Sequence, residues 1–118
     1  MAALSLALLG SIAASGGEAQ AQSMDGCPMY TVTAYSAEQY PGRTADGTST
    51  WEAIRTGEAI AAGSWNLPLG TTVEVEKIGT YRIADRGHLE SSHVDILTAT
   101  TAEALQIGRQ YRRVCVVE

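Results

Sequence analysis

Two aspartates, Asp85 and Asp95, lie ten positions apart in the segment "YRIADRGHLESSHVDIL", and Arg86, His88 and His93 lie close to them. Two neighbouring carboxylates can act as a general acid and a general base, the pair that cleavage of glycosidic bonds uses. The alternative is structural: Asp85 would cap the turn after it, and Asp95 would accept hydrogen bonds from backbone N–H groups. We favour the chemical interpretation.

The pattern around Asp95 indicates which face its side chain occupies. Its neighbours in "SHVDIL" are Val94 and Ile96, which we expect to point into a core. Because side chains alternate along a strand, Asp95 then points to the opposite face together with His93. Asp85 ends the segment "YRIAD" and is expected near the mouth of a barrel. A partly apolar pocket or a second carboxylate nearby would raise the pKa of such an aspartate and keep it protonated when substrate binds.

Two other kinds of site are set aside. His88 and His93, taken with Asp85, lack the spacing of a known zinc motif, so we expect no metal, and we expect no cofactor. The run Ser91-Ser92-His93 suggests a serine nucleophile with its base. Adjacent residues of a strand point to opposite faces, so this run alone cannot assemble a catalytic triad.

Four aromatic residues, Tyr35, Tyr40, Trp51 and Trp65, offer flat apolar faces to sugar rings, although each could belong to a core instead. Tyr35 lies next to a long loop and is the best candidate for a groove. Trp65, in "SWNLP", is expected in the core.

The elements that must position these residues are mostly short strands. Their patterns cover residues 29–36, 59–63, 71–77, 79–85, 92–97 and 111–117. One helix is expected before the last strand, because Thr100 and Glu103 form a capping-box pattern and helix formers follow up to Gly108. Residues 37–58 form a long turn-rich stretch, and such stretches usually carry function. The sequence therefore predicts an all-β fold, a small six-stranded barrel with one short helix.

The N-terminal segment predicts export. An apolar run at 2–14 leads into a small, polar stretch that ends in "AQA", typical of a secretory signal covering residues 1–21. No Lys or Arg precedes the run, and an N-terminal helix of the fold is the alternative. The run is too short to span a bilayer of about 30 Å. We expect a secreted or periplasmic protein of the cell wall, with a lead-in (22–28) and one domain (29–118) that does not insert into the membrane.

Two cysteines, Cys27 and Cys115, lie near the two ends of the exported chain. Because export leads to an oxidising compartment, a disulfide is the default. It would close a long loop, which the loop-entropy treatment credits with about 4–5 kcal/mol at most. The alternatives are a free thiol and a lipid-modified Cys27, although Asp25 in "SMDGC" fits a lipoprotein signal poorly.

Charge limits the partners. The formal net charge is −5, and removing the signal with its single charged residue, Glu18, leaves −4. No basic stripe suits a phosphate backbone, so nucleic acid is not expected. Arg109, Arg112 and Arg113 could meet an acidic ligand, but such a cluster is more typical of a solvated face. The remaining 97 residues (118 minus 21) make one domain, which we expect to be a monomer.

Five segments together resemble a known family. They are "TAYSAEQYPGRTADG", "AIAAGSWNLPLGTTVEV", "YRIADRG", "HVDIL" and "AEALQIGRQYRRVCVV". Their order and spacing resemble the 3D domain, a family of double-psi β-barrels found in membrane-bound lytic transglycosylase A and in bacterial cell-wall proteins. "ADRG" is also similar to rare lipoprotein A, and "HVD" resembles the His-Phe-Asp of expansins and family 45 endoglucanases. The likeness covers about residues 30–117.

The resemblance implies roles for single residues. Asp85 and Asp95 match two of the three aspartates for which the family is named. It implies that Asp95 is the acid/base and that Asp85 tunes it or holds the sugar. Gly63 replaces the first aspartate, as in the pattern of rare lipoprotein A, and this departure puts any role of that carboxylate in doubt.

The resemblance also implies a substrate groove. Thr44, Asp46 and Gly47 match the family's T-A-x-G loop at the groove edge, where Asp46 is either a further carboxylate or, more typically, part of an Asp-Gly turn. Substrate contacts are expected from Tyr35, Thr44, Asp46, Gly47, Arg86, Gly87 and His93.

The function implied is cleavage of peptidoglycan or a related polysaccharide, in the first place as a lytic transglycosylase. One aspartic acid protonates the glycosidic oxygen, and its carboxylate then takes the proton of the sugar's C6 hydroxyl, giving a 1,6-anhydro product. A non-catalytic wall-binding module of the expansin or barwin type is the alternative, favoured by Gly63 and the small size. A plain hydrolase is a third possibility and needs Asp46 or Asp85 to activate water.

Overall fold

The computed structural model of the chain describes residues 24–87 and 90–117. The predicted signal (1–21) and His88 lie outside these residues, so what the sequence predicts for them stays a prediction. The elements, in chain order, are η1 (Met24–Gly26), β1 (Met29–Ser36), α2 (Thr50–Thr56), β2 (Ile60–Gly63), β3 (Thr72–Val75), β4 (Gly79–Asp85), β5 (His93–Thr98), α3 (Thr101–Ile107) and β6 (Gln110–Val117).

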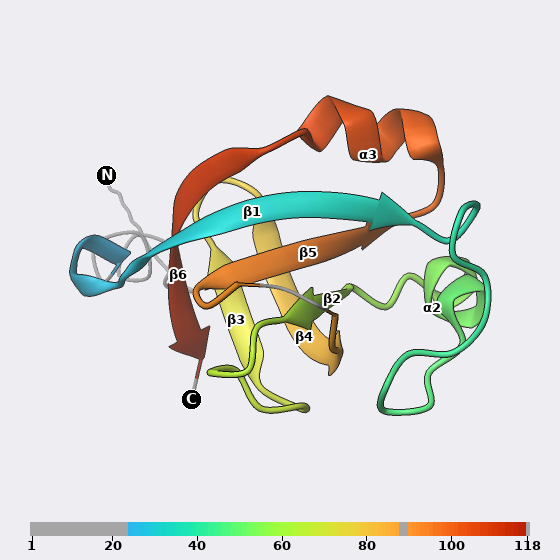
Figure 1. The fold of residues 1–118 in the computed structure, drawn as a ribbon, viewed down its shortest axis with the longest axis horizontal. Helices are drawn as coiled ribbons and strands as arrows, with labels where there is room; N and C mark the ends of the chain where they lie inside the picture. Colours follow the sequence, from blue (N-terminus) through green and yellow to red (C-terminus); the bar gives the residue numbers. More distant parts are fainter. Residues whose placement is uncertain (1–23, 88–89, 118) are drawn as a thin grey trace, which may run out of the picture.

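The six strands of the described residues close into a barrel in the order β1-β5-β2-β4-β3-β6. Two neighbouring pairs, β1 with β5 and β2 with β4, run parallel, and the other pairs run antiparallel. Figure 1 shows β1 and β5 side by side, with α3 above β1. The prediction of a small all-β barrel with six strands is confirmed.

One apolar cluster fills the inside of the barrel. Val73 and Val75 of β3 are buried while the residues between and beside them are partly exposed, and Val94 and Ile96 of β5 are buried in the same alternating way. The buried members are Tyr30, Val32, Ala61, Leu67, Val73, Val75, Ile83, Val94, Ile96 and Val114. Asp95, between two inward-pointing residues, therefore points away from this core, as predicted.

A second apolar cluster lies outside the barrel wall. Ala53 of α2 is buried there with Ile60 of β2, Ala84 of β4 and Leu97 of β5. In Figure 1, α2 lies beyond the end toward which β1 points. The expectation of a single helix is wrong, because the turn-rich stretch 37–58 contains α2, which covers part of the outer surface of the barrel.

Both helices have ordinary start signals. The Ser49 side chain accepts a hydrogen bond from the backbone N–H of Glu52 at 3.2 Å, and Gly57 ends α2 in the left-handed conformation with φ 77°. The predicted α3 is confirmed with its capping box between Thr100 and Glu103. Among the described residues, no helix is long and apolar enough to cross a membrane.

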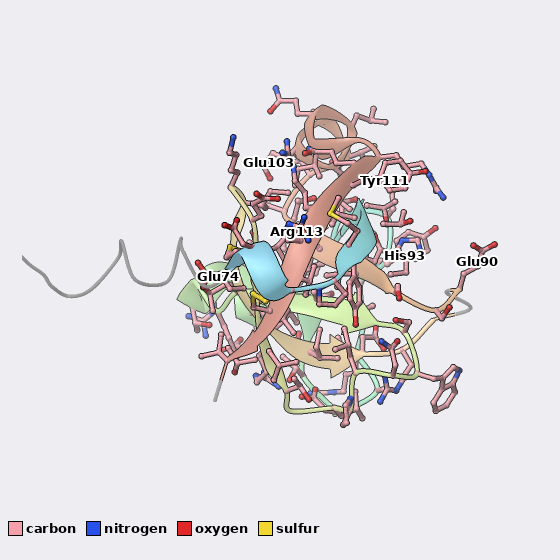
Figure 2. The ribbon with its side chains drawn as sticks, turned by 90° about the vertical axis from the view of Figure 1, so that its left-hand side faces the viewer. Glu74, Glu90, His93, Glu103, Tyr111 and Arg113 are labelled. Atoms are coloured by element: carbon pink, nitrogen blue, oxygen red, sulfur yellow. A yellow bond between two sulfur atoms is a disulfide. The ribbon has the colours of Figure 1, made fainter. Side chains whose placement is uncertain are left out.

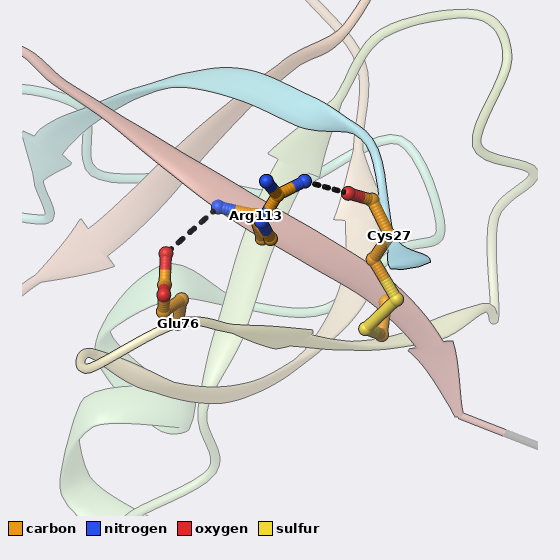
Figure 3. The surroundings of a disulfide bond; sticks show 4 residues. Cys27, Glu76 and Arg113 are labelled. Carbon is orange, nitrogen blue, oxygen red and sulfur yellow. Dashed lines mark hydrogen bonds between the residues drawn. A yellow bond between two sulfur atoms is a disulfide. The ribbon is translucent and has the colours of Figure 1, made fainter. Parts of the chain in front are cut away.

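Cys27 and Cys115 form the predicted disulfide, with their Cα atoms 5.3 Å apart. The bond joins the chain just before β1 to β6, the strand that pairs with β1. Beside it, Arg113 donates from Nη1 to the backbone oxygen of Cys27 at 2.7 Å, and its backbone N–H donates to the Glu76 carboxylate at 3.2 Å (Figure 3). The disulfide therefore reinforces the β1–β6 pairing of the closed barrel.

Candidate functional site

Four strands place one row of residues across the barrel wall. Asp95 of β5 has Thr33 of β1 as its register partner on one side and Ala62 of β2 on the other. Asp85 of β4 is a partner of Ala62 from the far side, next to a bulge. Because neighbouring strands lie about 4.8 Å apart, the backbones of the two aspartates are about 10 Å apart, with only a methyl side chain between them.

This row lines a pocket of about 390 Å³, within the range of about 300–1,000 Å³ common for ligand sites. The lining consists of Thr33, Ala34, Tyr35, Gln39, Tyr40, Ala62, Asp85, Arg86, Gly87 and Asp95. The structure thus brings together five of the residues that the sequence predicts for the site, namely Tyr35, Asp85, Arg86, Gly87 and Asp95.

Asp95 is a half-buried carboxyl held by one side chain. The Thr33 hydroxyl donates a hydrogen bond to Asp95 Oδ1 at 2.8 Å. Burial raises the pKa of Asp95 and Asp85 raises it further, and together they outweigh the lowering by the Thr33 hydrogen bond and by His93. Asp95 therefore keeps its proton to a higher pH than an ordinary aspartate, as a general acid requires.

Thr33 also connects Asp95 to His93. The His93 Nε2 atom lies 2.8 Å from the same Thr33 oxygen. A hydroxyl has one proton, so while Thr33 donates to ionised Asp95, His93 must donate to Thr33 from a protonated Nε2. Burial is the main cause that lowers the pKa of His93, and Arg109 lowers it too. Asp95 and Glu90 raise this pKa but do not offset the lowering, so the ring is neutral at pH 7. His93 does not line the pocket; Figure 2 shows it on the same side of the molecule as Glu90.

Asp85 combines both of the roles that the sequence allows. Its Oδ1 atom accepts backbone N–H groups of Arg86 at 2.8 Å and of Ala45 at 2.9 Å, which is the capping role. It also lines the pocket, where its charge helps to raise the pKa of Asp95. Asp85 therefore fixes the loop 43–48 against β4 while facing the same space as Asp95.

Tyr35 lines the pocket, as the sequence predicts. Its hydroxyl oxygen is buried and makes no hydrogen bond with any described residue. Burial, and then the charges of Asp85 and Asp95, raise the pKa of Tyr35, so the phenol stays protonated. The ring of Tyr40, which is 61 % exposed, meets the Tyr35 ring edge-on with 6.1 Å between centroids.

Arg86 braces the turn that follows β2. Its Nη1 atom donates to the backbone oxygens of Gly63 at 3.2 Å, Ser64 at 2.9 Å and Leu67. Its guanidinium carbon lies 5.0 Å from the centre of the Trp65 ring. Trp65 is 76 % exposed, so the expectation that it belongs to the core is wrong; Ser64 and Leu67 are the turn residues that point inward.

Packing around Gly63 leaves little room for a side chain. A Cβ added to Gly63 would lie 3.0 Å from Ile83 Cγ2 and 3.3 Å from Leu67 Cβ, closer than ordinary contacts. Ile83 is fully buried, so this space belongs to the core. An aspartate at position 63 would push its carboxylate toward apolar side chains.

The T-A-x-G loop lies outside the pocket lining, so Thr44, Asp46 and Gly47 make no contact there. Asp46 accepts hydrogen bonds from the hydroxyls of Thr44 and Thr48, at 2.8 and 2.7 Å, and forms an ion pair with Arg82. Burial alone would raise the pKa of Asp46, but the hydrogen bonds from Thr48, Thr44 and Arg82 lower it to about 2. Asp46 holds the turn, the interpretation that the sequence favours, and its predicted contact with substrate stays a prediction.

Sequence reasoning missed Thr33 and Ala62, which lie on either side of Asp95. The alternation in β1 places Thr33 on the same face as Tyr35, but its contact with Asp95 depends on parallel pairing with a strand sixty residues away. Within the described residues, no group of three or more His, Cys, Asp or Glu side chains is placed to hold a metal ion.

Compared with models of known protein families and with curated protein sequences, the chain gives no significant match. The likeness to the 3D domain thus rests on the quoted motifs and stays a prediction. What the geometry establishes is a pocket with two carboxyls, a buried phenol and an arginine on one closed barrel.

Proposed function

We propose that the protein is an exported peptidoglycan lytic transglycosylase of the 3D-domain, double-psi β-barrel type. The observation that carries the proposal is Asp95, a half-buried carboxyl with a raised pKa that faces a pocket of ligand size. A transglycosylase needs one carboxylic acid and no activated water, and Asp95 fits that requirement.

In the proposed reaction, protonated Asp95 gives its proton to the glycosidic oxygen as the bond from that oxygen to C1 breaks. The Asp95 carboxylate then accepts the proton of the C6 hydroxyl on the same sugar, and the C6 oxygen forms the new bond to C1. The products are a 1,6-anhydro end and a strand with a new free hydroxyl. Asp95 ends protonated, and no water is consumed.

Two neighbours support Asp95 in this scheme. The Thr33 hydroxyl orients its carboxyl. Asp85 opposes ionisation of Asp95 before the reaction and, as a negative charge in the same pocket, stabilises positive charge that develops at C1.

A non-catalytic polysaccharide-binding module is the second candidate. Two observations favour it. One oxygen of Asp85 already accepts hydrogen bonds from two backbone N–H groups, and Gly63 stands where the 3D-domain family has its first aspartate. A hydrolase is the third candidate. Because Asp46 lies outside the pocket lining, Asp85 would have to activate its water.

The test is digestion of purified peptidoglycan by the chain without its predicted signal (22–118), followed by mass spectrometry of the released muropeptides. The wild type is compared with Asp95→Asn. Asp46→Asn serves as the matched control, because it removes a carboxylate outside the pocket.

The proposal expects 1,6-anhydro products from the wild type and from Asp46→Asn, and none from Asp95→Asn. Products without the anhydro group would favour the hydrolase. No products from any variant, with the protein still sedimenting with the wall, would leave the binding module.

A further inference from the structure

The turn between β2 and β3 displays an aromatic side chain that the proposed reaction does not use. Trp65 is 76 % exposed, the highest value among the large hydrophobic residues of the described chain. Exposure of a whole indole ring to water costs apolar burial that a folded chain normally recovers. A single exposed hydrophobic residue is common on protein surfaces, so what matters is how this ring is held and what lies beside it.

The turn that carries Trp65 is rigid. Ser64 is buried, and its hydroxyl accepts the backbone N–H of His93 at 3.1 Å and donates to Asn66 Oδ1 at 2.6 Å. The Asn66 amide in turn donates to the Tyr30 hydroxyl at 2.7 Å, and the backbone N–H of Ser64 donates to the His93 oxygen at 3.0 Å. The residues on both sides of Trp65 are therefore fixed to the barrel.

Arg86 connects Trp65 to the pocket. Its guanidinium lies against the indole ring at 5.0 Å, and Arg86 is also one of the residues that line the pocket, next to Asp85. Within the described chain, the guanidinium of Arg86 donates its hydrogen bonds to backbone oxygens of the turn, and it forms no ion pair with a described carboxylate. Arg86 thus holds the ring in a fixed orientation at the pocket edge.

We infer that Trp65 is a stacking subsite for a sugar ring of a polysaccharide strand that continues beyond the pocket. A pyranose presents a flat face of C–H groups, which an exposed indole ring covers at little entropic cost because the turn and Arg86 already hold it. The subsite is continuous with the pocket through Arg86. This inference rests on the proposed function, since the strand in the pocket supplies the ring that reaches Trp65.

The two tryptophans of the chain make the test direct. Trp51, 47 % exposed on α2, does not line the pocket and serves as the matched control. All variants carry Asp95→Asn, so that no strand is cut. Peptide-free glycan strands of defined length, including a single disaccharide, are titrated into Trp51→Phe, whose fluorophore is Trp65, and into Trp65→Phe, whose fluorophore is Trp51.

The inference expects a saturable change of emission with long strands in Trp51→Phe and none in Trp65→Phe. Affinity for long strands, measured by calorimetry, should fall about fivefold to tenfold in Trp65→Ala and stay unchanged in Trp51→Ala. Affinity for the single disaccharide should be the same in Trp65→Ala and in Trp51→Ala.

If the Asp95→Asn parent binds long strands and Trp65→Ala binds them equally well, the subsite is wrong while the proposed function stands. If Trp65→Ala weakens the disaccharide as much as the long strand, Trp65 acts on the pocket and the subsite is again wrong. If the parent binds no strand, the proposed function fails and the subsite with it.

Discussion

At the scale of single residues, the site depends on the environment of one carboxyl. Asp95 has its pKa raised by burial and by Asp85, and lowered by the hydrogen bond from Thr33. Thr33 therefore has two effects: it orients the carboxyl, and it limits how far the pKa rises. A change at Thr33 should show in the pH dependence of cleavage as well as in its rate.

Replacing Thr33 by valine should move the alkaline limit of activity to higher pH. The acid must be protonated, so the rate falls as pH rises through the pKa of Asp95. Valine removes the hydrogen bond that stabilises the ionised form, so this pKa rises further. The measurement is the pH profile of kcat/KM on solubilised glycan strands, with the exposed Thr80→Val as control. An alkaline limit that stays in place or moves to lower pH would contradict the role given to Thr33.

At the scale of elements, the row Thr33–Asp95–Ala62–Asp85 exists because β2 lies between β5 and β4. Ala62 has the smallest side chain in the row, a single methyl group, and it leaves the space between the two carboxyls open. The turn after β2 and the loop 43–48 then fix the edges of this pocket through Arg86 and Asp85. The pocket is therefore a property of strand order rather than of any one motif.

A side chain at Gly63 should destabilise the barrel. Alanine there would press on Ile83, at a cost of about 1–2 kcal/mol in the free energy of unfolding, and aspartate should cost more because its carboxylate would enter the core. Denaturant unfolding measures both. Gly26→Ala is the control, since a Cβ there meets nothing within 4 Å, and Ile83→Val should recover part of the loss. Gly63→Asp as stable as the wild type would contradict the packing explanation.

The Asp46 turn should make the loop sensitive to acid. The pKa of Asp46 is lowered to about 2 from an ordinary value of 3.8, so its ionised form contributes stability above about pH 4, and this contribution is lost as pH falls toward 2. Asp46→Asn should lower the free energy of unfolding by roughly 1 kcal/mol at pH 7. The gap to the wild type should close near pH 2 in thermal scans; a constant gap across this range would speak against the ion pair with Arg82 as its source.

The elements also show how far the sequence reaches. Alternation of apolar residues is a local signal, so the predicted strands 29–36 and 79–85 coincide with β1 and β4, and the capping box located α3. The helix α2 carries the same kind of signal, because Ser49 is followed three residues later by Glu52. The turn residues around this signal favour a loop instead. Contacts that depend on strand pairing, such as Thr33 with Asp95, have no local signal at all. The residues next to Trp65 in the sequence likewise give no signal that its side chain is exposed.

At the scale of the whole molecule, closure of the barrel depends on the pairing of β1 with β6, and the disulfide lies beside that pair. Its two cysteines are separated by 88 positions, so in the unfolded chain the bond closes most of the described sequence into a loop. Neither cysteine lines the pocket. The disulfide should therefore affect stability and leave the chemistry alone.

Replacing both cysteines by serine should lower the free energy of unfolding by about 2–5 kcal/mol. For a domain of this size, each kcal/mol corresponds to about 4–8 °C in Tm. Thermal unfolding of the double variant, and of the wild type with and without reductant, measures the loss. Well below its Tm the variant should cut glycan at the wild-type rate; an unchanged Tm would contradict the structural role of the bond.

The measurement that tests the central claim most directly is digestion of peptidoglycan in water enriched in oxygen-18, with mass spectrometry of the new ends. The claim is that Asp95 alone, acting as acid and then as base, cuts the strand without water. The wild type should then release products that carry no heavy oxygen at the new ends. Asp95→Asn should release no products at all. Heavy oxygen at each cut, or unchanged cleavage by Asp95→Asn, would contradict it.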